Sequence, residues 1–491
     1  MRNVINTLNE ISEITFISLL FLIGFLIGCL AINARGPYYI SPDGTGYHNY
    51  AVNIALRGVY SPAYKYPYTV NFTREPGYPM FLAAVYKIYD IFGEPTLLNW
   101  DEYNVTTTTM KIKKGEIQCA KYAQLILLII SVYFIYKILI NLHSIGKARF
   151  ISLLIILYYP FTSYCAYIMR ESLVTFLLAL FAFCIVKFYL CKKQLYLLLA
   201  TIAIALAAFT WQVMVVFTPL ILIIMLLSKI RFWQSIKYII LYAIIFISLL
   251  FPWFAYVYSY YPNLKIVTSM GTSLTPEVIN WTNALLEAEY FGEISNEELY
   301  QIYGRGRTEL PEAEIFQRSF SGWYSASADS ITRKLNLSFK QQLQYKGYKA
   351  FKNLKGLFLQ NNWTPFVEKF RESISFITKG YSKTENKYDI IITIQTLVLN
   401  ILSILIGVFS ILGFIVYNKR NLIYWIPYLF YCALFYIIGS ESRRFIPVLP
   451  WILYLSYYFI FYAYKKLSMH KHKAIKENRI QLISSEFNLC I

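Results

Sequence analysis

The sequence predicts an all-α polytopic membrane protein, a bundle of about ten transmembrane helices (range about 9–12) with loops and amphipathic helices on the outer face. Three observations predict it. The 491 residues are 57% hydrophobic and only 15% charged, and the hydrophobic residues come in long runs. Tyrosine and phenylalanine are abundant, as in helices whose ends lie at lipid–water interfaces. The net charge of +19 falls largely in short loops and the tail, which indicates membrane topology rather than nucleic-acid binding.

The hydrophobic runs divide the chain. The first span covers roughly residues 14–32, and the polar loop after it contains a short apolar piece, Gly77–Phe92, which is too short to cross a bilayer comfortably. Further spans are predicted at 118–140, 149–168, 172–190, two within 195–228 with a turn at Trp211-Gln212, then 238–257, 389–417, 421–438 and 445–463. We therefore expect an N-terminal transmembrane module over 1–257 with its outer loop at 33–117, an outer polar segment over 258–388, C-terminal transmembrane helices over 389–464 and a basic tail over 465–491.

Basic residues in alternate short loops predict the orientation. With cytoplasmic N- and C-termini, every short inner loop is basic, through Lys147 and Arg149, Lys192 and Lys193, Lys229 and Arg231, and Lys419 and Arg420. The loop at 33–117 and the segment at 258–388 then lie together on the outer face. In that segment, Lys346, Lys349, Lys352 and Lys355 recur beside Phe351, Leu354 and Phe358. This pattern predicts an amphipathic helix on the outer surface, either a plain interfacial helix or a cover over a site that also meets anionic lipid.

The seven cysteines and four histidines show no CxxC motif and no Cys/His ligand spacing. Most of the cysteines lie in or beside apolar spans, so we expect them to pack between membrane helices. No metal site is predicted.

The outer loop at 33–117 holds the residues that chemistry at a membrane surface needs. Asp43, Tyr47 and Ala51 are spaced i, i+4, i+8 and would share one face of a helix that starts at the turn containing Pro42 and Gly44. Asp43 is predicted to be either the cap of that helix or a catalytic base.

Three more charged groups stand at predicted outer helix ends. Arg74-Glu75 precedes Pro76-Gly77-Tyr78-Pro79, whose prolines fix the backbone where the chain re-enters apolar sequence. Arg170-Glu171 lies at a second outer turn. Arg443 and Arg444 contradict the positive-inside pattern in a short outer loop, so we expect them either to have a functional role or to form an ion pair with Glu441.

Taken in order, these motifs resemble the membrane-embedded GT-C glycosyltransferases, and most closely the bacterial protein-mannosyltransferase and aminoarabinose-transferase group, glycosyltransferase family 39. The matching segments are D-x-x-x-Y-x-x-x-A from Asp43, R-x-P-G-Y-P-x-F-L-A from Arg74, Tyr159-Pro160 with Arg170-Glu171-Ser172-Leu173, and Glu441-Ser442-Arg443-Arg444-Phe445. The resemblance covers about residues 10–465. Two positions depart from it: Gly44 stands where the family often has a second acid, and Trp211-Gln212 stands where many relatives have Arg-Pro or Lys-Pro.

The resemblance implies a GT-C-like bundle and an inverting transfer of a sugar from a polyprenyl-phosphate donor to a glycan, lipid or protein acceptor, at the outer face of a bacterial plasma membrane. Asp43 would be the catalytic base. It requires no cofactor, leaves room for a divalent cation, and involves the lipid bilayer but no nucleic acid. The substrate-binding residues would be Arg74, Glu75, Tyr47, Tyr78, Arg443, Arg444, Glu441, Arg170 and Glu171.

Two other function classes stay open. A transporter or flippase for lipid-linked oligosaccharides, or a polymerase that uses them, would also have many helices, and Lys121, Gln124 and Lys137 within one span are polar residues of the kind a transport path needs. The other class is an inactive membrane scaffold with the same fold. The outer-end position of the remaining charged residues favours the enzyme.

Overall fold

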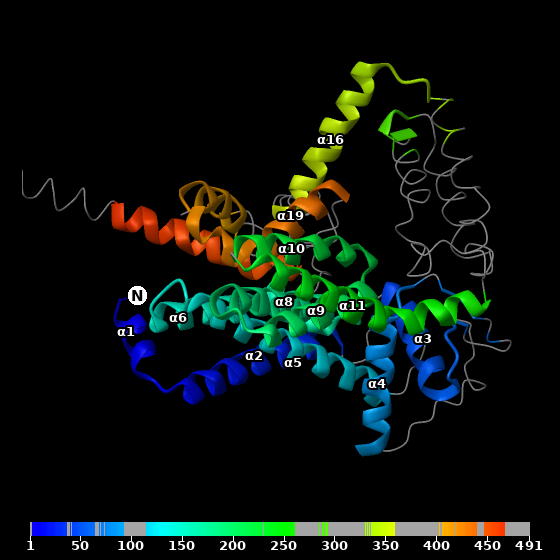
Figure 1. Cartoon of the computed structure of the whole chain (residues 1–491), viewed down its shortest axis with the longest axis horizontal. Coiled ribbons are helices and arrows are strands. Elements are labelled where there is room, and N and C mark those ends of the chain that lie inside the picture. Colours follow the sequence, from blue (N-terminus) through cyan, green and yellow to red (C-terminus); the bar gives the residue numbers. More distant parts are fainter. Residues whose placement is uncertain are drawn as a thin grey trace, which may run out of the picture.

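The structure is a computed structural model of the whole chain, and in the part of the chain that it describes the regular elements are helices joined by loops (Figure 1). The described residues are 2–36, 40, 42–63, 68, 70–72, 74–92, 114–228, 230–260, 284, 287–288, 290–292, 329, 331, 333, 335–358, 402, 405–417, 419–438 and 446–466.

The N-terminal half begins with α1 (Arg2–Glu10), α2 (Glu13–Arg35), α3 (Pro42–Arg57), α4 (Gly77–Phe92) and α5 (Lys114–Leu139). It continues with α6 (Ile145–Leu157), α7 (Tyr159–Thr162), η2 (Ser163–Ala166), α8 (Glu171–Cys191), α9 (Gln194–Thr210), η3 (Gln212–Phe217), α10 (Thr218–Leu227) and α11 (Phe232–Tyr260). In the later part of the chain, the structure describes α16 (Phe339–Phe358), η6 (Lys419–Trp425) and α19 (Ile426–Ile438). It also describes helices at Leu405–Val416 and Ile446–Lys466.

Five described helices are long and apolar enough to cross a membrane: Glu13–Arg35, Ile117–Leu139, Glu171–Cys191, Trp233–Tyr260 and Ile446–Lys466. A sixth span results if α6 and Tyr159–Ala166, which meet at a bend of 64°, are taken together. The chain is therefore a multi-pass membrane protein. The count within the described residues is lower than the predicted number, because several apolar runs form shorter helices, namely Gln194–Thr210, Gln212–Met225, Leu405–Val416 and α19.

The bend at the end of α6 has a covalent cause. The predicted span at 149–168 contains Pro160, which has no backbone N–H to give to the carbonyl of Ile156 four residues earlier. The hydroxyl of Thr162 donates to that carbonyl instead, at 2.6 Å. The helix consequently stops at Leu157 and resumes in a new direction.

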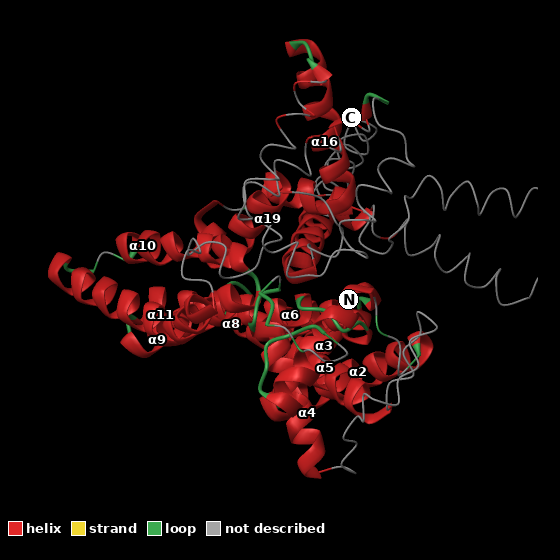
Figure 2. Cartoon of the chain, turned by 90° about the vertical axis from the view of Figure 1, so that its right-hand side faces the viewer, coloured by secondary structure: helices red, strands yellow, loops and turns green. Residues whose placement is uncertain are grey.

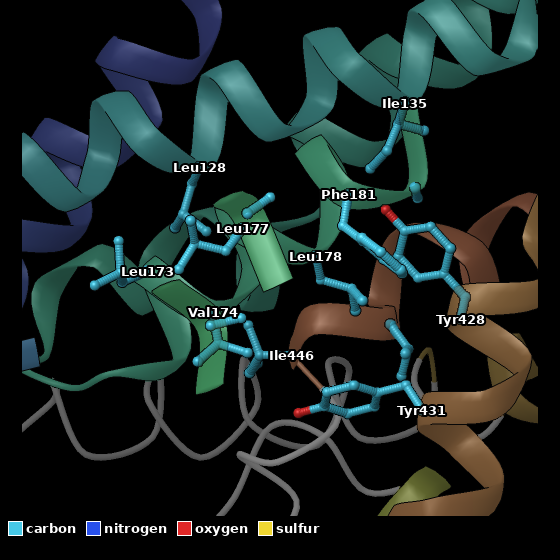
Figure 3. Packing of buried hydrophobic residues seen from close by; sticks show 14 of the residues in the cluster. Leu128, Ile135, Leu173, Val174, Leu177, Leu178, Phe181, Tyr428, Tyr431 and Ile446 are labelled. Carbon is cyan, nitrogen blue, oxygen red and sulfur yellow. The ribbon is translucent and has the colours of Figure 1, made fainter. Parts of the chain in front are cut away.

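The core is built around α8. Two thirds (67%) of its apolar window is buried inside the protein, against 28% for α2 and 11% for α11, so α8 is central while α2 and α11 turn most of their surface to lipid. Figure 3 shows side chains of α5, α8 and α19 packed together with Ile446. The labelled residues are Leu128, Ile135, Leu173, Val174, Leu177, Leu178, Phe181, Tyr428, Tyr431 and Ile446.

Helices α1 and α6 lie at one end of the bundle, and α3 and α4 lie at the other (Figure 1). At one end, Arg149 donates to the carbonyls of Leu8 and Ile11 at 2.8 and 2.7 Å and so ties α1 to α6. Lys137 forms an ion pair with Glu13 there. At the other end α3 packs against α4, and this end carries the loop in which chemistry is predicted.

The polar residues of α5 that were compatible with a transport path each have a structural partner. Lys121 donates to the carbonyl of Gly36 at 2.9 Å and thereby satisfies the end of α2. Lys137 pairs with Glu13. Gln124 bonds to groups of α4 and of the segment after η2, as described below. These contacts explain why Lys121, Gln124 and Lys137 are polar, and no transport path is needed to explain them.

Candidate functional site

Helix α3 forms where the i, i+4, i+8 spacing predicted it, over Pro42–Arg57. Pro42 occupies its first position, where a missing N–H costs no hydrogen bond. Tyr47 and Ala51, one turn apart, are 3% and 0% exposed and belong to the main core. Asp43 lies in the first turn of the same helix, one turn before Tyr47; its side chain lies outside the described residues.

The chain after α3 folds back along that helix. Asn53 donates to the carbonyls of Ser61 and Ala63 at 2.7 and 2.8 Å. The Tyr50 hydroxyl donates to Asn71 at 3.0 Å. These bonds hold the returning loop on α3 and deliver its last residues, Arg74 and Glu75, to the beginning of that helix.

Arg74 lies over the beginning of α3. Its guanidinium carbon is 5.1 Å from the centre of the Tyr47 ring, a cation–π contact. A Cβ built on Gly46 would lie 3.9 Å from Arg74 Nε. The backbone carbonyl of Arg74 accepts a hydrogen bond from Tyr60 at 2.8 Å, so the residue is anchored at its main chain as well.

Glu75 is buried and joined to Arg170. Its side chain is 1% exposed, and Oε2 accepts from Arg170 Nη1 at 2.7 Å. Oε1 is also buried and has no hydrogen-bond partner among the described residues. A buried carboxylate oxygen that keeps free acceptor capacity is costly unless a donor reaches it. Glu75 therefore has one oxygen bonded to Arg170 and one buried oxygen that can accept a further hydrogen bond.

Trp211 completes the surroundings of Arg170. The Arg170 guanidinium carbon is 4.5 Å from the centre of the indole, which is 1% exposed. Trp211 sits at the break between α9 and η3, with extended backbone angles (φ −152°, ψ 108°). The sequence indicated the turn at Trp211-Gln212 correctly but did not indicate that Trp211 stacks on a site residue. The clue was its place at a predicted outer helix end, which it shares with Arg170.

The close approach of α4 to α9 brings these groups together. A Cβ on Gly77 would lie 2.7 Å from the backbone nitrogen of Thr210 and 2.8 Å from the carbonyl carbon of Phe209. Only glycine allows this spacing. Because Gly77 follows Glu75 by two residues and Thr210 precedes Trp211, the contact sets Glu75 beside the Arg170–Trp211 pair.

Tyr47 interacts with four charged residues, namely Arg74, Glu75, Arg170 and Glu171. Burial raises the pKa of its hydroxyl, and the positive charges of Arg170 and Arg74 partly oppose that rise. Glu75 and Glu171 add to it. Glu171 is 3% exposed in the first turn of α8, where a negative charge is favoured by the helix dipole. Two arginines and two glutamates therefore surround one tyrosine at the α3–α4 end of the bundle.

Tyr78 packs against Tyr47. Its ring meets that of Tyr47 edge-on, with centroids 5.0 Å apart. Its hydroxyl donates to Gln124 Oε1 at 2.7 Å, and Gln124 Nε2 in turn donates to the carbonyls of Cys165 and Tyr167 at 3.2 and 2.9 Å. The Tyr78 hydroxyl is thus committed to the fold, and its ring supports Tyr47.

His48, the neighbour of Tyr47, points into a different part of the interior. Its Nδ1 lies 2.8 Å from the Tyr86 hydroxyl of α4. Burial lowers the pKa of the imidazole to about 4, so it is neutral at ordinary pH. We interpret His48 as a residue that joins α3 to α4.

The site residues predicted from the sequence thus divide into two sets. The structure brings together Arg74, Glu75, Tyr47, Tyr78, Arg170 and Glu171. Glu441, Arg443 and Arg444 lie outside the described residues, as does the Asp43 side chain. Within the part of the chain that the structure describes, there is no group of three or more His, Cys, Asp or Glu side chains placed to hold a metal ion.

No protein-family model and no curated protein matches this chain. Among solved structures, one similar chain is the crystal structure of ArnT from Cupriavidus metallidurans bound to undecaprenyl phosphate. The likeness covers 91% of this chain and 78% of that chain, at 12% sequence identity and a TM-score of 0.40.

Proposed function

We propose that the protein is a membrane-embedded glycosyltransferase that moves a sugar from a polyprenyl-phosphate donor to an acceptor hydroxyl at the outer face of the membrane. The observation that carries the proposal is the cluster at one end of the bundle. There, Arg74 and the buried Glu75–Arg170 pair lie beside Tyr47 in α3, the helix whose first turn contains Asp43. A lipid donor stays in the bilayer while its head group reaches this end.

Asp43 is the proposed catalytic base. The acceptor oxygen bonds to the anomeric carbon while its proton moves to the Asp43 carboxylate. The bond between the anomeric carbon and the phosphate oxygen breaks, and its electron pair leaves with the polyprenyl phosphate. Attack opposite the phosphate inverts the anomeric centre in a single displacement. A carboxylate near the membrane boundary suits this role because partial desolvation raises its basicity.

The arginines are proposed to hold the phosphate. A guanidinium presents a fixed fork of donors that matches phosphate oxygens and stabilises the charge that develops on the leaving group. Arg74 is anchored through its carbonyl by Tyr60 and lies over the start of α3, which suits a phosphate next to Asp43. We also assign this role to Arg443 and Arg444, with Glu441 as their partner.

Glu75 is proposed to bind a hydroxyl of the sugar. Arg170 already occupies Oε2, and Trp211 packs on the other side of Arg170, so the carboxylate is fixed in place. Oε1, which has no hydrogen-bond partner among the described residues, then accepts from the substrate. Such a preorganised acceptor orients the ring without taking part in the proton transfer.

The test compares cell envelopes by mass spectrometry. Cells with the intact protein are set beside cells with Asp43→Asn at matched membrane levels. Removing a general base lowers turnover by about 10²–10⁴-fold, so we expect a hexose- or pentose-sized addition on lipid, glycan or protein to disappear.

Glu13→Gln is the matched control. It removes a carboxylate at the opposite end of the bundle, where Glu13 pairs with Lys137, and should leave the modification intact. Envelopes that are the same for the intact protein and Asp43→Asn, but that change when the whole chain is deleted, would rule out Asp43 as the base and favour a transporter or a scaffold.

A further inference from the structure

We propose that α16 is a docking surface for an anionic membrane surface, which it meets through an exposed apolar stripe flanked by lysines. The inference is independent of the proposed enzymatic reaction. It concerns a helix of 20 residues, Phe339–Phe358, in the outer polar segment.

The first observation is the exposure of one side of the helix. Phe339 is 80% exposed and Leu343 is 60% exposed, and the two residues are one turn apart on the same face. Large apolar side chains that remain this exposed at helical spacing are unfavourable in water, since burying each one would contribute about 1.5–3 kcal/mol. Exposure to water alone therefore does not explain why Phe339 and Leu343 lie on one face of α16.

The second observation is that the opposite side of α16 is already in use. Tyr345 is 7% exposed, and its ring centre lies 5.6 Å from that of Tyr290. Residues two positions apart point about 200° from each other on an α-helix, so Leu343 faces away from the Tyr290 contact. The rest of the described chain therefore holds α16 by one face and leaves the other face outward.

The third observation is charge. Lys340 and Lys346 stand on either side of the stripe and are exposed. The sequence of α16 also contains Lys349, Lys352 and Lys355 and has no acidic residue. An apolar stripe flanked by lysines complements a layer of anionic head groups above acyl chains, because the lysine stems extend over apolar surface while their ammonium groups reach phosphate.

The fourth observation is the direction of the helix. In both views α16 rises away from the bundle, and Figure 1 shows it at a large angle to α5 and α8 (Figures 1 and 2). A helix at a large angle to the membrane-spanning helices is not one that crosses the bilayer beside them, as expected for an interfacial helix.

The experiment uses the full chain reconstituted in nanodiscs of phosphatidylcholine, with or without phosphatidylglycerol. A photoreactive p-benzoylphenylalanine replaces Leu343 in one protein and Tyr345 in another, and adducts are identified by mass spectrometry after illumination. We expect lipid adducts at position 343 and crosslinks within the protein at position 345. The yield at 343 should be higher with phosphatidylglycerol.

Charge reversal tests the lysines separately. Lys340→Glu with Lys346→Glu should lower the yield of phosphatidylglycerol adducts at position 343 by up to about fivefold for each lysine, since one basic residue near an anionic surface contributes about 1 kcal/mol. The same change should have little effect in phosphatidylcholine alone. Crosslinks from position 343 to residues 33–117 or to a second copy of the chain would overturn the proposal. Equal yields in both lipids that charge reversal does not change would overturn the anionic preference.

Discussion

Arg170 donates to Glu75 at 2.7 Å, although the two residues are 95 positions apart in the chain. The pair joins the chain just before α4 to the beginning of α8. Its side chains are 13% and 1% exposed, so both charges are largely removed from solvent and depend on each other.

Breaking this pair from one side should destabilise the protein strongly. Arg170→Met or Glu75→Gln alone leaves one buried charge unpaired, which costs about 3–5 kcal/mol. The double variant Glu75→Gln with Arg170→Met removes both charges and should lose less than the sum of the two single changes. Thermal unfolding in detergent measures all three. Strict additivity of the single and double variants would show that the two residues do not interact in the membrane protein.

A methyl group on Gly77 should separate α4 from α9. In Gly77→Ala the new Cβ would stand 2.7 Å from the backbone nitrogen of Thr210, and backbone cannot rotate away, so we expect a loss of about 1–3 kcal/mol. Gly347→Ala in α16 is the matched control because nothing lies within 4 Å of its Cβ position.

The control should unfold at the same temperature as the parent protein or above it, because alanine is the better helix former. Because the Gly77 contact also positions Glu75, activity should fall in Gly77→Ala and persist in Gly347→Ala. Parent-like stability and activity in Gly77→Ala would show that α4 and α9 do not approach closely.

His48 should make stability depend on pH. Burial lowers the pKa of its imidazole to about 4 from the usual 6.5, so the folded state favours the neutral form. The contribution of His48 is complete above the ordinary pKa and is lost as pH falls from that value towards about 4, by up to roughly 3 kcal/mol. His48→Gln should show a shallower fall in unfolding temperature over this pH range. If unfolding temperature fell equally steeply with pH in the parent and in His48→Gln, the imidazole would be hydrated and its pKa would not be lowered.

Replacing Gln124 should cost more stability than replacing Tyr78, which is one of its four hydrogen-bond partners. Gln124 Nε2 donates to two carbonyls, and its Oε1 accepts from the Tyr78 hydroxyl at 2.7 Å and from the backbone N–H of Met169 at 3.4 Å. Gln124→Leu leaves these groups without their partner, which costs roughly 3 kcal/mol, whereas Tyr78→Phe removes one bond and costs about 1 kcal/mol. Unfolding temperatures in detergent compare them. A smaller loss for Gln124→Leu than for Tyr78→Phe would show that water replaces the amide.

Local signals predicted much of the fold. The lengths of the apolar runs predicted α2, α5, α8 and α11, and i, i+4 spacing predicted α3. The sequence also placed the short apolar helix at Gly77–Phe92 and the break at Trp211. Each of these depends on residues that are close together in the chain, which is why a sequence alone carries the information.

Long-range contacts were not predictable in the same way. Arg74-Glu75 and Arg170-Glu171 were recognised as site candidates because each is a charged pair at a helix end. Nothing in the sequence indicated that Glu75 would bond to Arg170 rather than to its neighbour Arg74. That choice depends on the close packing of Gly77 against Thr210, which exists only after α4 and α9 have met. The span predicted at 149–168 is apolar over Ile145–Leu157 and Tyr159–Ala166 taken together, but the two parts meet at a bend of 64°. The bend has a local cause, the missing N–H of Pro160.

Trp211 also connects the site to the late part of the chain. Its indole contacts Tyr431 of α19 edge-on, with centroids 6.4 Å apart, and also lies against Arg170. During synthesis the ribosome delivers residues 1–257 long before α19, so the Arg170–Trp211 stack gains its contact with Tyr431 only late. The order of membrane insertion therefore makes the site one of the last parts of the protein to acquire its final packing, after nearly nine tenths of the chain has been made.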